Sequence, residues 1–122
     1  MKFVLVLLIV ASLPTYVHAD AASDGEHAVV LMEQVATIID TNKDNCDAMG
    51  DKLTAFFDKN AAELKRLKES GKSVSAEQKK QFSEKYKDRM KAVSDKMMTG
   101  LKNCSNNTKV SDAMKKMSAS SH

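Results

Sequence analysis

Residues 46–104 decide the fold, and they read CDAMGDKLTAFFDKNAAELKRLKESGKSVSAEQKKQFSEKYKDRMKAVSDKMMTGLKNC. Good helix formers fill this stretch on both sides of residues 71–74, which have room only for a short turn. Two helices joined by so short a turn must run antiparallel. At a rise of about 1.5 Å per residue, the two ends of the stretch return to the same end of a helical hairpin.

The stretch begins at Cys46 and ends at Cys104, the only cysteines in the chain. The hairpin brings them within a turn or two of each other, so we predict an internal disulfide at its open end. The alternatives are two free thiols, intermolecular bridges and a paired metal site. An even cysteine count in an exported chain favours the internal bridge, and the lack of neighbouring histidines disfavours zinc.

Export is predicted from the start of the chain. Lys2 precedes an apolar run over residues 3–13, Pro14 ends the run, and residues 17–19 (Val-His-Ala) are typical of a signal-peptidase site. The run is too short to span a membrane, which takes about 20 residues. We therefore predict a cleaved signal peptide over residues 1–19, no transmembrane segment, and a periplasmic or extracellular protein.

Apolar residues recur at three- and four-residue steps in four segments, which is the spacing of one helix face. The four faces are Ala28, Leu31, Met32, Val35, Ile38 and Ile39; Cys46, Met49, Leu53, Phe56, Phe57, Ala61, Leu64 and Leu67; Phe82, Tyr86, Met90, Val93, Met97, Leu101 and Cys104; and Val110, Ala113, Met114 and Met117. The predicted helices cover about residues 26–42, 46–70, 75–104 and 110–117.

The helix ends carry capping signals. Ser23 with Glu26, and Ser75 with Gln78, have the three-residue spacing of a capping box, so each pair is predicted to start a helix. Gly71 stands where a left-handed residue would end the second helix.

The chain therefore reads as all-α, an antiparallel four-helix bundle built on a long hairpin with one internal disulfide. A single proline and four glycines in 122 residues suit long helices better than a β-sandwich. The predicted division is a signal peptide over 1–19, a flexible N-terminus over 20–24, the helical domain over 25–117 and a disordered tail over 118–122.

Composition narrows the function. A formal net charge of +3 is too small for a bulk polyanion binder, so no nucleic-acid partner is predicted. His27 and His122 follow the predicted signal peptide but form no catalytic constellation with other residues, and Glu33 lies off the apolar stripe, where we expect it to be solvated. No cofactor and no enzymatic activity are predicted.

The hairpin tip is the candidate binding surface. The first and fourth helices join the hairpin at its cysteine end and are too short to cover it, so the tip over residues 65–80 is expected to project. Its basic residues are Lys65, Arg66, Lys68, Lys72, Lys79 and Lys80. A projecting basic tip suits an anionic surface or an acidic protein, and a solvated pair of helix ends is the alternative.

A family resemblance begins at the third helix start. Residues 74–82, Val-Ser-Ala-Glu-Gln-Lys-Lys-Gln-Phe, resemble the Leu-Thr-x-x-Gln motif of the Spy/CpxP family of periplasmic stress proteins, and the likeness continues at Tyr86 and Arg89. The resemblance implies an ATP-independent chaperone, often a cradle-shaped homodimer, that binds protein clients on the hairpin surface. It also implies structural roles for Gln78 and Phe82. Here Val-Ser stands in place of Leu-Thr, the motif occurs once, and the disulfide is foreign to the family.

Methionine suggests a further alternative. Met114 and Met117 have a spacing that could hold Cu(I), but all methionines after the signal except Met98 fall on the predicted apolar faces, where methionine fills gaps in a core. The main hypothesis is a small exported, non-catalytic binding protein. A Spy-like chaperone is the first alternative and a methionine-based copper carrier the second.

Overall fold

The computed structural model describes residues 20–120, and within that range all regular secondary structure is α-helical. The predicted signal peptide lies outside the described residues. The helices are α2 (Asp20–Thr41), α3 (Cys46–Lys59), α4 (Ala61–Lys72), α5 (Ala76–Lys85), α6 (Lys87–Asn103) and α7 (Thr108–Ser120). The all-α prediction is confirmed, whereas the prediction of four uninterrupted helices is wrong.

The two long predicted helices each bend once. Asn60 separates α3 from α4 with φ −104° and ψ 11°, and Tyr86 separates α5 from α6 with φ −105° and ψ 10°. At Asn60 the side-chain amide donates to the carbonyl oxygen of Phe56, a local bond that competes with regular helix. Backbone bonds continue through both bends, so neither leaves a break that composition would reveal.

The first helix begins earlier than its sequence suggested. α2 starts at Asp20, so residues 20–24 are helical and Ser23 is not an N-cap. Glu26 does not turn back to close a capping box, because its carboxylate accepts bonds from Tyr86 and Arg89 instead. The predicted tail is also partly helical, since α7 runs to Ser120.

At the turn between α4 and α5, one predicted helix cap is confirmed and another is wrong. Ser75 and Gln78 form the predicted capping box in both directions, at 3.0 and 3.1 Å. Gly71 is not a left-handed cap, because it lies inside α4 and no described glycine has positive φ. The helix ends at Lys72 instead, and its C-cap is Ser73, whose hydroxyl donates to the carbonyl oxygen of Ser70.

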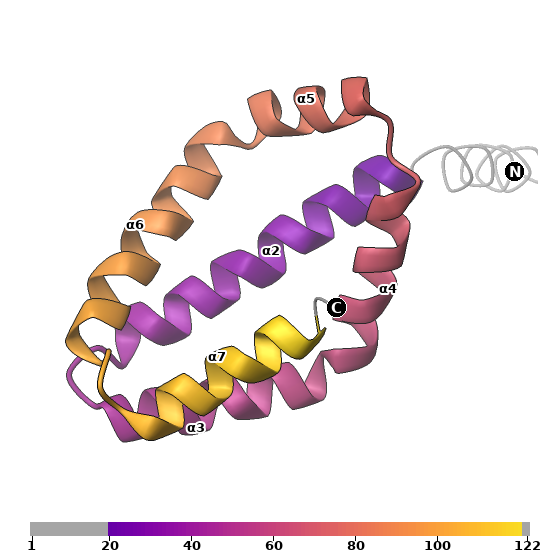
Figure 1. The fold of residues 1–122 in the computed structure, drawn as a ribbon. Helices are drawn as coiled ribbons and strands as arrows, with labels where there is room; N and C mark the ends of the chain where they lie inside the picture. The colour runs from indigo at the N-terminus through magenta and orange to yellow at the C-terminus, as the bar shows by residue number, and fades with distance from the viewer. Residues whose placement is uncertain (1–19, 121–122) are drawn as a thin grey trace, which may run out of the picture.

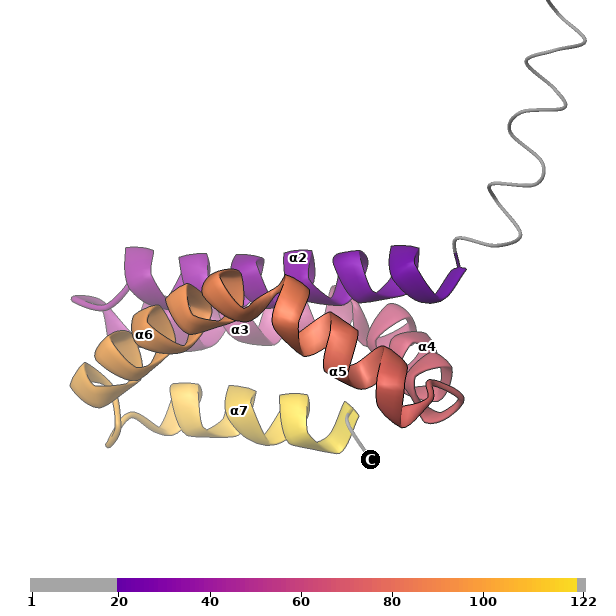
Figure 2. The same ribbon diagram turned by 90° about the horizontal axis from the view of Figure 1, so that it is seen from above.

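The helices pair differently from a packed hairpin. The extensive contacts join α3 to α7 and α2 to α6, and α2 also touches α3 and α4. The arm α3–α4 and the arm α5–α6 diverge from their common ends, with α2 crossing between them (Figure 1). Seen from above, α2 lies on one side of the molecule, α7 on the other and α3 between them (Figure 2).

Two glycines permit the main helix contacts. A Cβ at Gly50 would lie 2.5 Å from Cβ of Lys109, so α7 can approach α3 only because that atom is absent. At Gly100 a Cβ would collide with Cγ2 of Ile39, on the contact between α6 and α2. Close packing of this kind leaves no room for even one methyl group.

The core lies at these two contacts. Its buried cluster is Val35, Ile39, Met49, Leu53, Phe57, Cys104, Val110 and Ala113. Cys46 and Cys104 form the predicted disulfide, with 5.4 Å between their Cα atoms, and it joins the start of α3 to the end of α6. The core is therefore concentrated at the cysteine end of the molecule.

Candidate ligand-binding site

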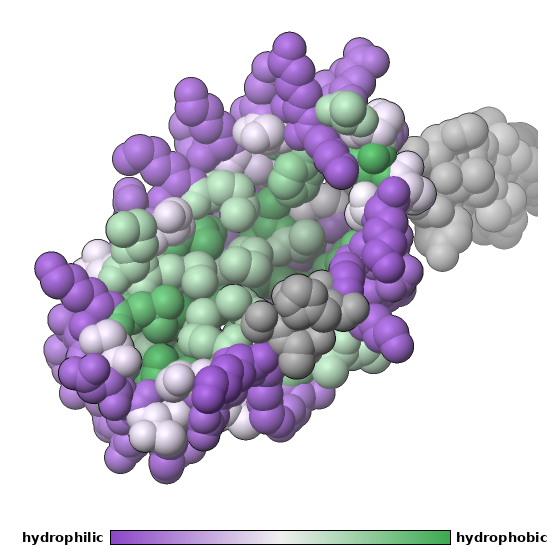
Figure 3. Space-filling view, viewed as in Figure 1, coloured by the Kyte–Doolittle hydropathy of each residue, from purple (hydrophilic) through white to green (hydrophobic). Residues whose placement is uncertain are grey.

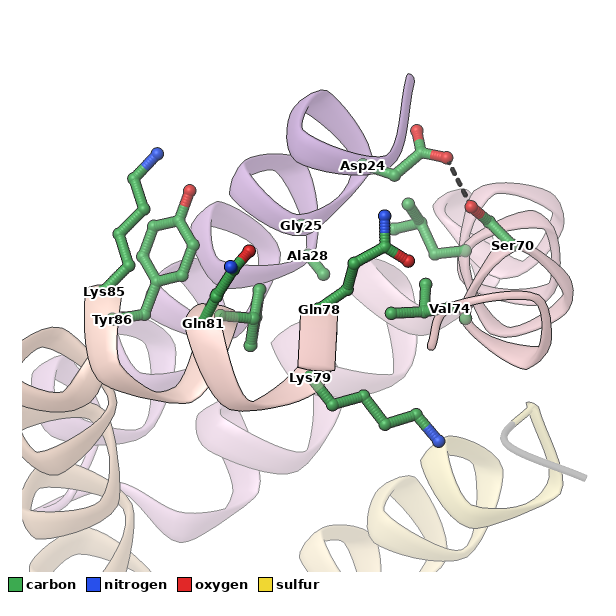
Figure 4. A pocket seen from close by; sticks show the side chains of 13 residues that line it. Asp24, Gly25, Ala28, Ser70, Val74, Gln78, Lys79, Gln81, Lys85 and Tyr86 are labelled. Carbon is green, nitrogen blue, oxygen red and sulfur yellow. Dashed lines mark hydrogen bonds between the residues drawn. The ribbon is translucent and has the colours of Figure 1, made fainter. Parts of the chain in front are cut away.

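A pocket of about 470 Å³ opens where α4, α5 and the first turns of α2 meet (Figure 4). We call it the α4–α5 pocket. Its lining residues are Asp24, Gly25, Ala28, Leu67, Ser70, Gly71, Val74, Gln78, Lys79, Gln81, Phe82, Lys85 and Tyr86. The volume falls in the range of small-molecule sites, about 300–1,000 Å³.

The walls of the pocket are mainly apolar. Leu67 and Val74 come from α4 and the turn, Phe82 and Tyr86 from α5 and the bend, and Ala28 from α2. All are partly or fully shielded from solvent, although neither α4 nor α5 buries any residue completely. Apolar side chains at this end of the molecule therefore stay partly exposed, whereas those of α3 at the cysteine end are buried.

Polar groups stand at the rim. Gln78, Gln81 and Lys85 extend from α5 on one side, as Figure 4 shows, and Lys79 extends the other way, towards α7. The amide oxygen of Gln78 accepts from the backbone N–H of Ser75. The same bond that starts α5 thus fixes the orientation of one rim side chain.

Phe82 and Gly25 define the depth of the pocket. A Cβ at Gly25 would lie 2.9 Å from Cδ2 and Cε2 of Phe82, so the ring rests against bare helix backbone. The Phe82 ring also packs against the Tyr86 ring in a tilted arrangement, with 4.8 Å between centroids and 51° between planes. Tyr86 is 3% exposed and donates to Glu26 at 3.2 Å.

The two arginines of the chain hold α2 against both arms. Arg66 on α4 donates to both oxygens of Asp24, at 3.3 and 3.0 Å, and also binds Glu63 on its own helix. Ser70 donates to Asp24 at 2.7 Å. The hydrogen bonds from Arg66 and Ser70 hold the pKa of Asp24 below its ordinary value.

Arg89 makes the second clamp, from α6 to α2. Its guanidinium donates to Glu33 at 3.1 and 2.6 Å and to Glu26 at 3.0 Å, and it lies 5.4 Å from the centroid of the Tyr86 ring. The bonds from Arg89 lower the pKa of both carboxyls and raise the pKa of the guanidinium. Glu33 is partly exposed, as expected off the apolar stripe, but its carboxylate is also paired with Arg89, which the sequence did not predict.

The predicted basic tip is not a free projection. α2 reaches it, because Asp24 binds Arg66 and Ser70 there. Lys72 pairs with Glu69 at 3.2 Å. Within residues 20–120, the tip residues that form no ion pair are Lys65, Lys68, Lys79 and Lys80, and of these only Lys79 lines the pocket.

A broader apolar face adjoins the pocket. Figure 3 shows hydrophobic residues gathered in the hollow that α4, α5, α6 and α7 surround, with hydrophilic residues around its border. The surrounding helices carry hydrophobic residues that are only partly buried against the core, namely Leu64, Met97, Leu101, Met114 and Met117. Met98 is 68% exposed, and it is the methionine that the sequence placed off the apolar faces.

The described part of the chain gives little support for a metal site or a membrane-spanning helix. Residues 20–120 contain no cluster of three or more His, Cys, Asp or Glu side chains arranged to hold a metal. Met114 and Met117 pack against the core cluster, as gap-filling methionines do. None of the described helices combines the length and the apolar character that crossing a membrane requires.

Sequence reasoning named Arg66, Lys79 and Phe82 as candidate residues, but it missed Asp24 and did not predict the ion pairs that Arg66 and Arg89 make with α2. One signal was present, because the chain uses lysine at seventeen positions and arginine at only two, Arg66 and Arg89. Arginine's planar fork suits bidentate contacts to carboxylates, so a rare arginine among lysines suggests a structural ion pair.

Comparison with protein-family models, with curated proteins and with solved structures finds no match for this chain.

Proposed function

We propose that this is a small exported, non-catalytic binding protein, and that it holds the apolar part of its ligand in the α4–α5 pocket. The observation that carries the proposal is the pocket itself, a cavity of about 470 Å³ with apolar walls and a polar rim. Concave sites with this combination are the usual places for small ligands.

The distribution of stabilising contacts supports this assignment. At the cysteine end, α3 buries Met49, Gly50, Leu53 and Phe57, whereas α4 and α5 bury no residue completely. Arg66 and Arg89 nevertheless hold α2 beside both arms. An ion pair thus holds the α4 and α2 sides of the pocket together, and the apolar side chains of its walls stay available to a ligand.

A neutral apolar fluorophore tests the proposal directly. N-phenyl-1-naphthylamine gains fluorescence on entering an apolar site, so we expect a saturable increase with the purified, disulfide-bonded protein. Val74→Trp should remove most of the increase, because the indole fills the pocket from the turn. The chain has no native tryptophan, so the new indole also reports whether the pocket is occupied.

The matched control is Ala62→Trp, which adds the same side chain at an exposed position of α4 outside the pocket. It should bind the fluorophore as the unmodified protein does. A flat titration of the unmodified protein, or equal binding by Val74→Trp and Ala62→Trp, would overturn the proposal.

A chaperone-like activity is the second candidate, and the apolar face in Figure 3 favours it. Flexible methionine side chains can repack around different partners, as promiscuous binding surfaces require. This reading agrees with the resemblance of residues 74–82 to the Spy/CpxP motif. The protein should then slow the aggregation of a chemically denatured client protein in the absence of ATP.

Two adjacent methionines of α6 provide the test. Met97 is partly buried against the core beside the apolar face, and Met98 is 68% exposed. Met97→Gln should reduce the protection of the client more than Met98→Gln does. Equal protection by both variants would argue against this second candidate.

A further inference from the structure

The lining of the α4–α5 pocket carries an uncompensated positive charge. Its lining cations are Lys79 and Lys85, and its one lining acid is Asp24. Asp24 is already neutralised by Arg66, with Ser70 as a further donor. Within residues 20–120, neither lysine of the lining has an ion-pair partner, although Lys85 lies 5.3 Å from the centroid of the Tyr86 ring. A negatively charged ligand group is therefore favoured over a positive one.

The two lysines stand at opposite sides of the pocket. In Figure 4, Lys85 points to the same side of the pocket as the Asp24–Ser70 hydrogen bond. Glu26 and Arg89 both contact Tyr86, the residue next to Lys85, so charged groups already surround this lysine. Lys79 points to the other side, towards the end of α7, and no acidic residue lines the pocket there. The anion should consequently be bound at Lys79 rather than at Lys85.

Apolar surface leads inward from Lys79. Leu67 and Val74 line the pocket from α4 and the turn after it, Phe82 lines it from α5, and Ala28 lines it from α2. A ligand with one anionic group at the end of an apolar chain satisfies this arrangement. A group with several charges would leave charge unpaired, because Lys79 is the one lysine of the pocket lining that points to this side.

We propose that the α4–α5 pocket binds a medium-chain fatty acid, with its carboxylate at Lys79 and its hydrocarbon chain along Leu67, Val74 and Phe82. This inference rests on the proposed function, that the pocket binds the apolar part of a ligand, and adds the chemical class of that ligand. The volume of about 470 Å³ is adequate for a chain of this kind.

Displacement of bound N-phenyl-1-naphthylamine by three ligands of equal chain length tests the inference. Decanoate and decyltrimethylammonium are used below their micelle concentrations and decanol below its solubility limit, all at neutral pH and low salt. Decanoate should compete best and decyltrimethylammonium worst, and the advantage of decanoate over decanol should shrink as salt screens the lysine.

Two adjacent lysines supply the matched variants. Lys79→Gln should weaken decanoate binding about fivefold, the size expected for one exposed ion pair, and leave decanol binding unchanged. Lys80→Gln removes the same charge at a residue outside the pocket lining and should leave both ligands unaffected.

The outcomes separate the two proposals. If decanol competes as well as decanoate, or if Lys80→Gln weakens decanoate as much as Lys79→Gln does, the fatty-acid inference is overturned and the apolar-ligand proposal stands. If the fluorophore and all three ligands fail to bind, the proposed function itself fails.

Discussion

The two ends of this molecule are held together by different forces. At the cysteine end, α3 and α7 meet over Gly50, α2 and α6 meet over Gly100, and the disulfide joins the two arms. At the pocket end, α4 and α5 bury no residue completely. Arg66 ties α4 to α2, and Arg89 ties α6 to α2 beside the Tyr86 ring, which follows α5. The comparison indicates that tight apolar packing supplies the stability at one end, while polar clamps keep an apolar site open at the other.

Removing the disulfide should have the largest effect. Replacing Cys46 and Cys104 together by alanine frees a loop whose ends are 58 residues apart in sequence, which lowers the free energy of unfolding by about 4 kcal/mol in the chain-entropy estimate. Urea denaturation followed by circular dichroism measures the loss. Reduction of the unmodified protein is the control and should give a similar loss, whereas a difference below about 1 kcal/mol would show that packing alone closes this end.

Glycine substitutions at the helix contacts should come next. Gly50→Ala would place its Cβ 2.5 Å from Cβ and 2.6 Å from the carbonyl carbon of Lys109, and Gly100→Ala would push against Ile39. Overpacking of this kind costs about 1–3 kcal/mol, more than the gain of up to about 1 kcal/mol that alanine brings to a helix. Both variants should lower the urea midpoint, and an increase for either would show that the helices can separate without cost.

The arginine clamps should make the stability of the pocket end depend on pH. Asp24, Glu26 and Glu33 have lowered pKa values in the folded protein, so their contribution to stability is present above their ordinary values of 3.8 and 4.5 and is lost as pH falls through the lower folded values. Arg89→Lys cannot make the same forked contacts to Glu26 and Glu33. It should be less stable than the unmodified protein at pH 7, and the difference should shrink as pH falls below about 4.

The control for this experiment is Lys91→Gln, which removes an exposed pair with Asp95 on the surface of α6. It should change stability little at any pH, because such pairs contribute little. Amide hydrogen exchange would locate the effect. If exchange in α5 and at the start of α2 increases at a higher pH than exchange in α3 as the pH is lowered, the pocket end is the less stable end, as proposed. A uniform loss of protection over all helices would contradict this difference between the two ends.

Features of the fold that depend on the spacing of residues along the chain could be predicted from the sequence. The all-α class, the Cys46–Cys104 bridge and the Ser75 capping box follow from periodicity, cysteine parity and a three-residue interval, and the structure contains all three. These features were predictable because the residues that determine them either lie close together in the chain or can be counted along a helix.

The pocket could not be predicted in the same way. It exists because the chain bends at Asn60 and Tyr86, where helical hydrogen bonding continues and leaves no compositional mark. It is framed by Asp24 and Glu26, whose partners Arg66 and Arg89 are 42 and 63 residues away. Local patterns favoured a capping role for Glu26, and only the tertiary structure brings it to Arg89.

Replacing either of the two glycines that line the pocket, Gly71 and Gly25, by alanine should have the smallest effect on stability. Around Gly71 a Cβ would meet nothing within 4 Å, so Gly71→Ala should stabilise α4 by about 0.4–1 kcal/mol and leave the pocket unchanged. At Gly25 the Cβ would lie 2.9 Å from the Phe82 ring, which can rotate because it is only partly buried. The gain in helix propensity should then be offset by the displaced ring, with little net change in the urea midpoint.

Ligand binding should show the opposite order. Gly25→Ala moves Phe82 within the pocket and should weaken the binding of N-phenyl-1-naphthylamine, whereas Gly71→Ala should bind it as the unmodified protein does. The variant that loses binding would thus not be the variant whose stability changes most. This is expected if the side chains around the pocket bind a ligand and contribute little to the core. Equal binding by the two variants would mean that Phe82 does not form part of the site, and the pocket would then have to be assigned to the α2 and α4 side alone.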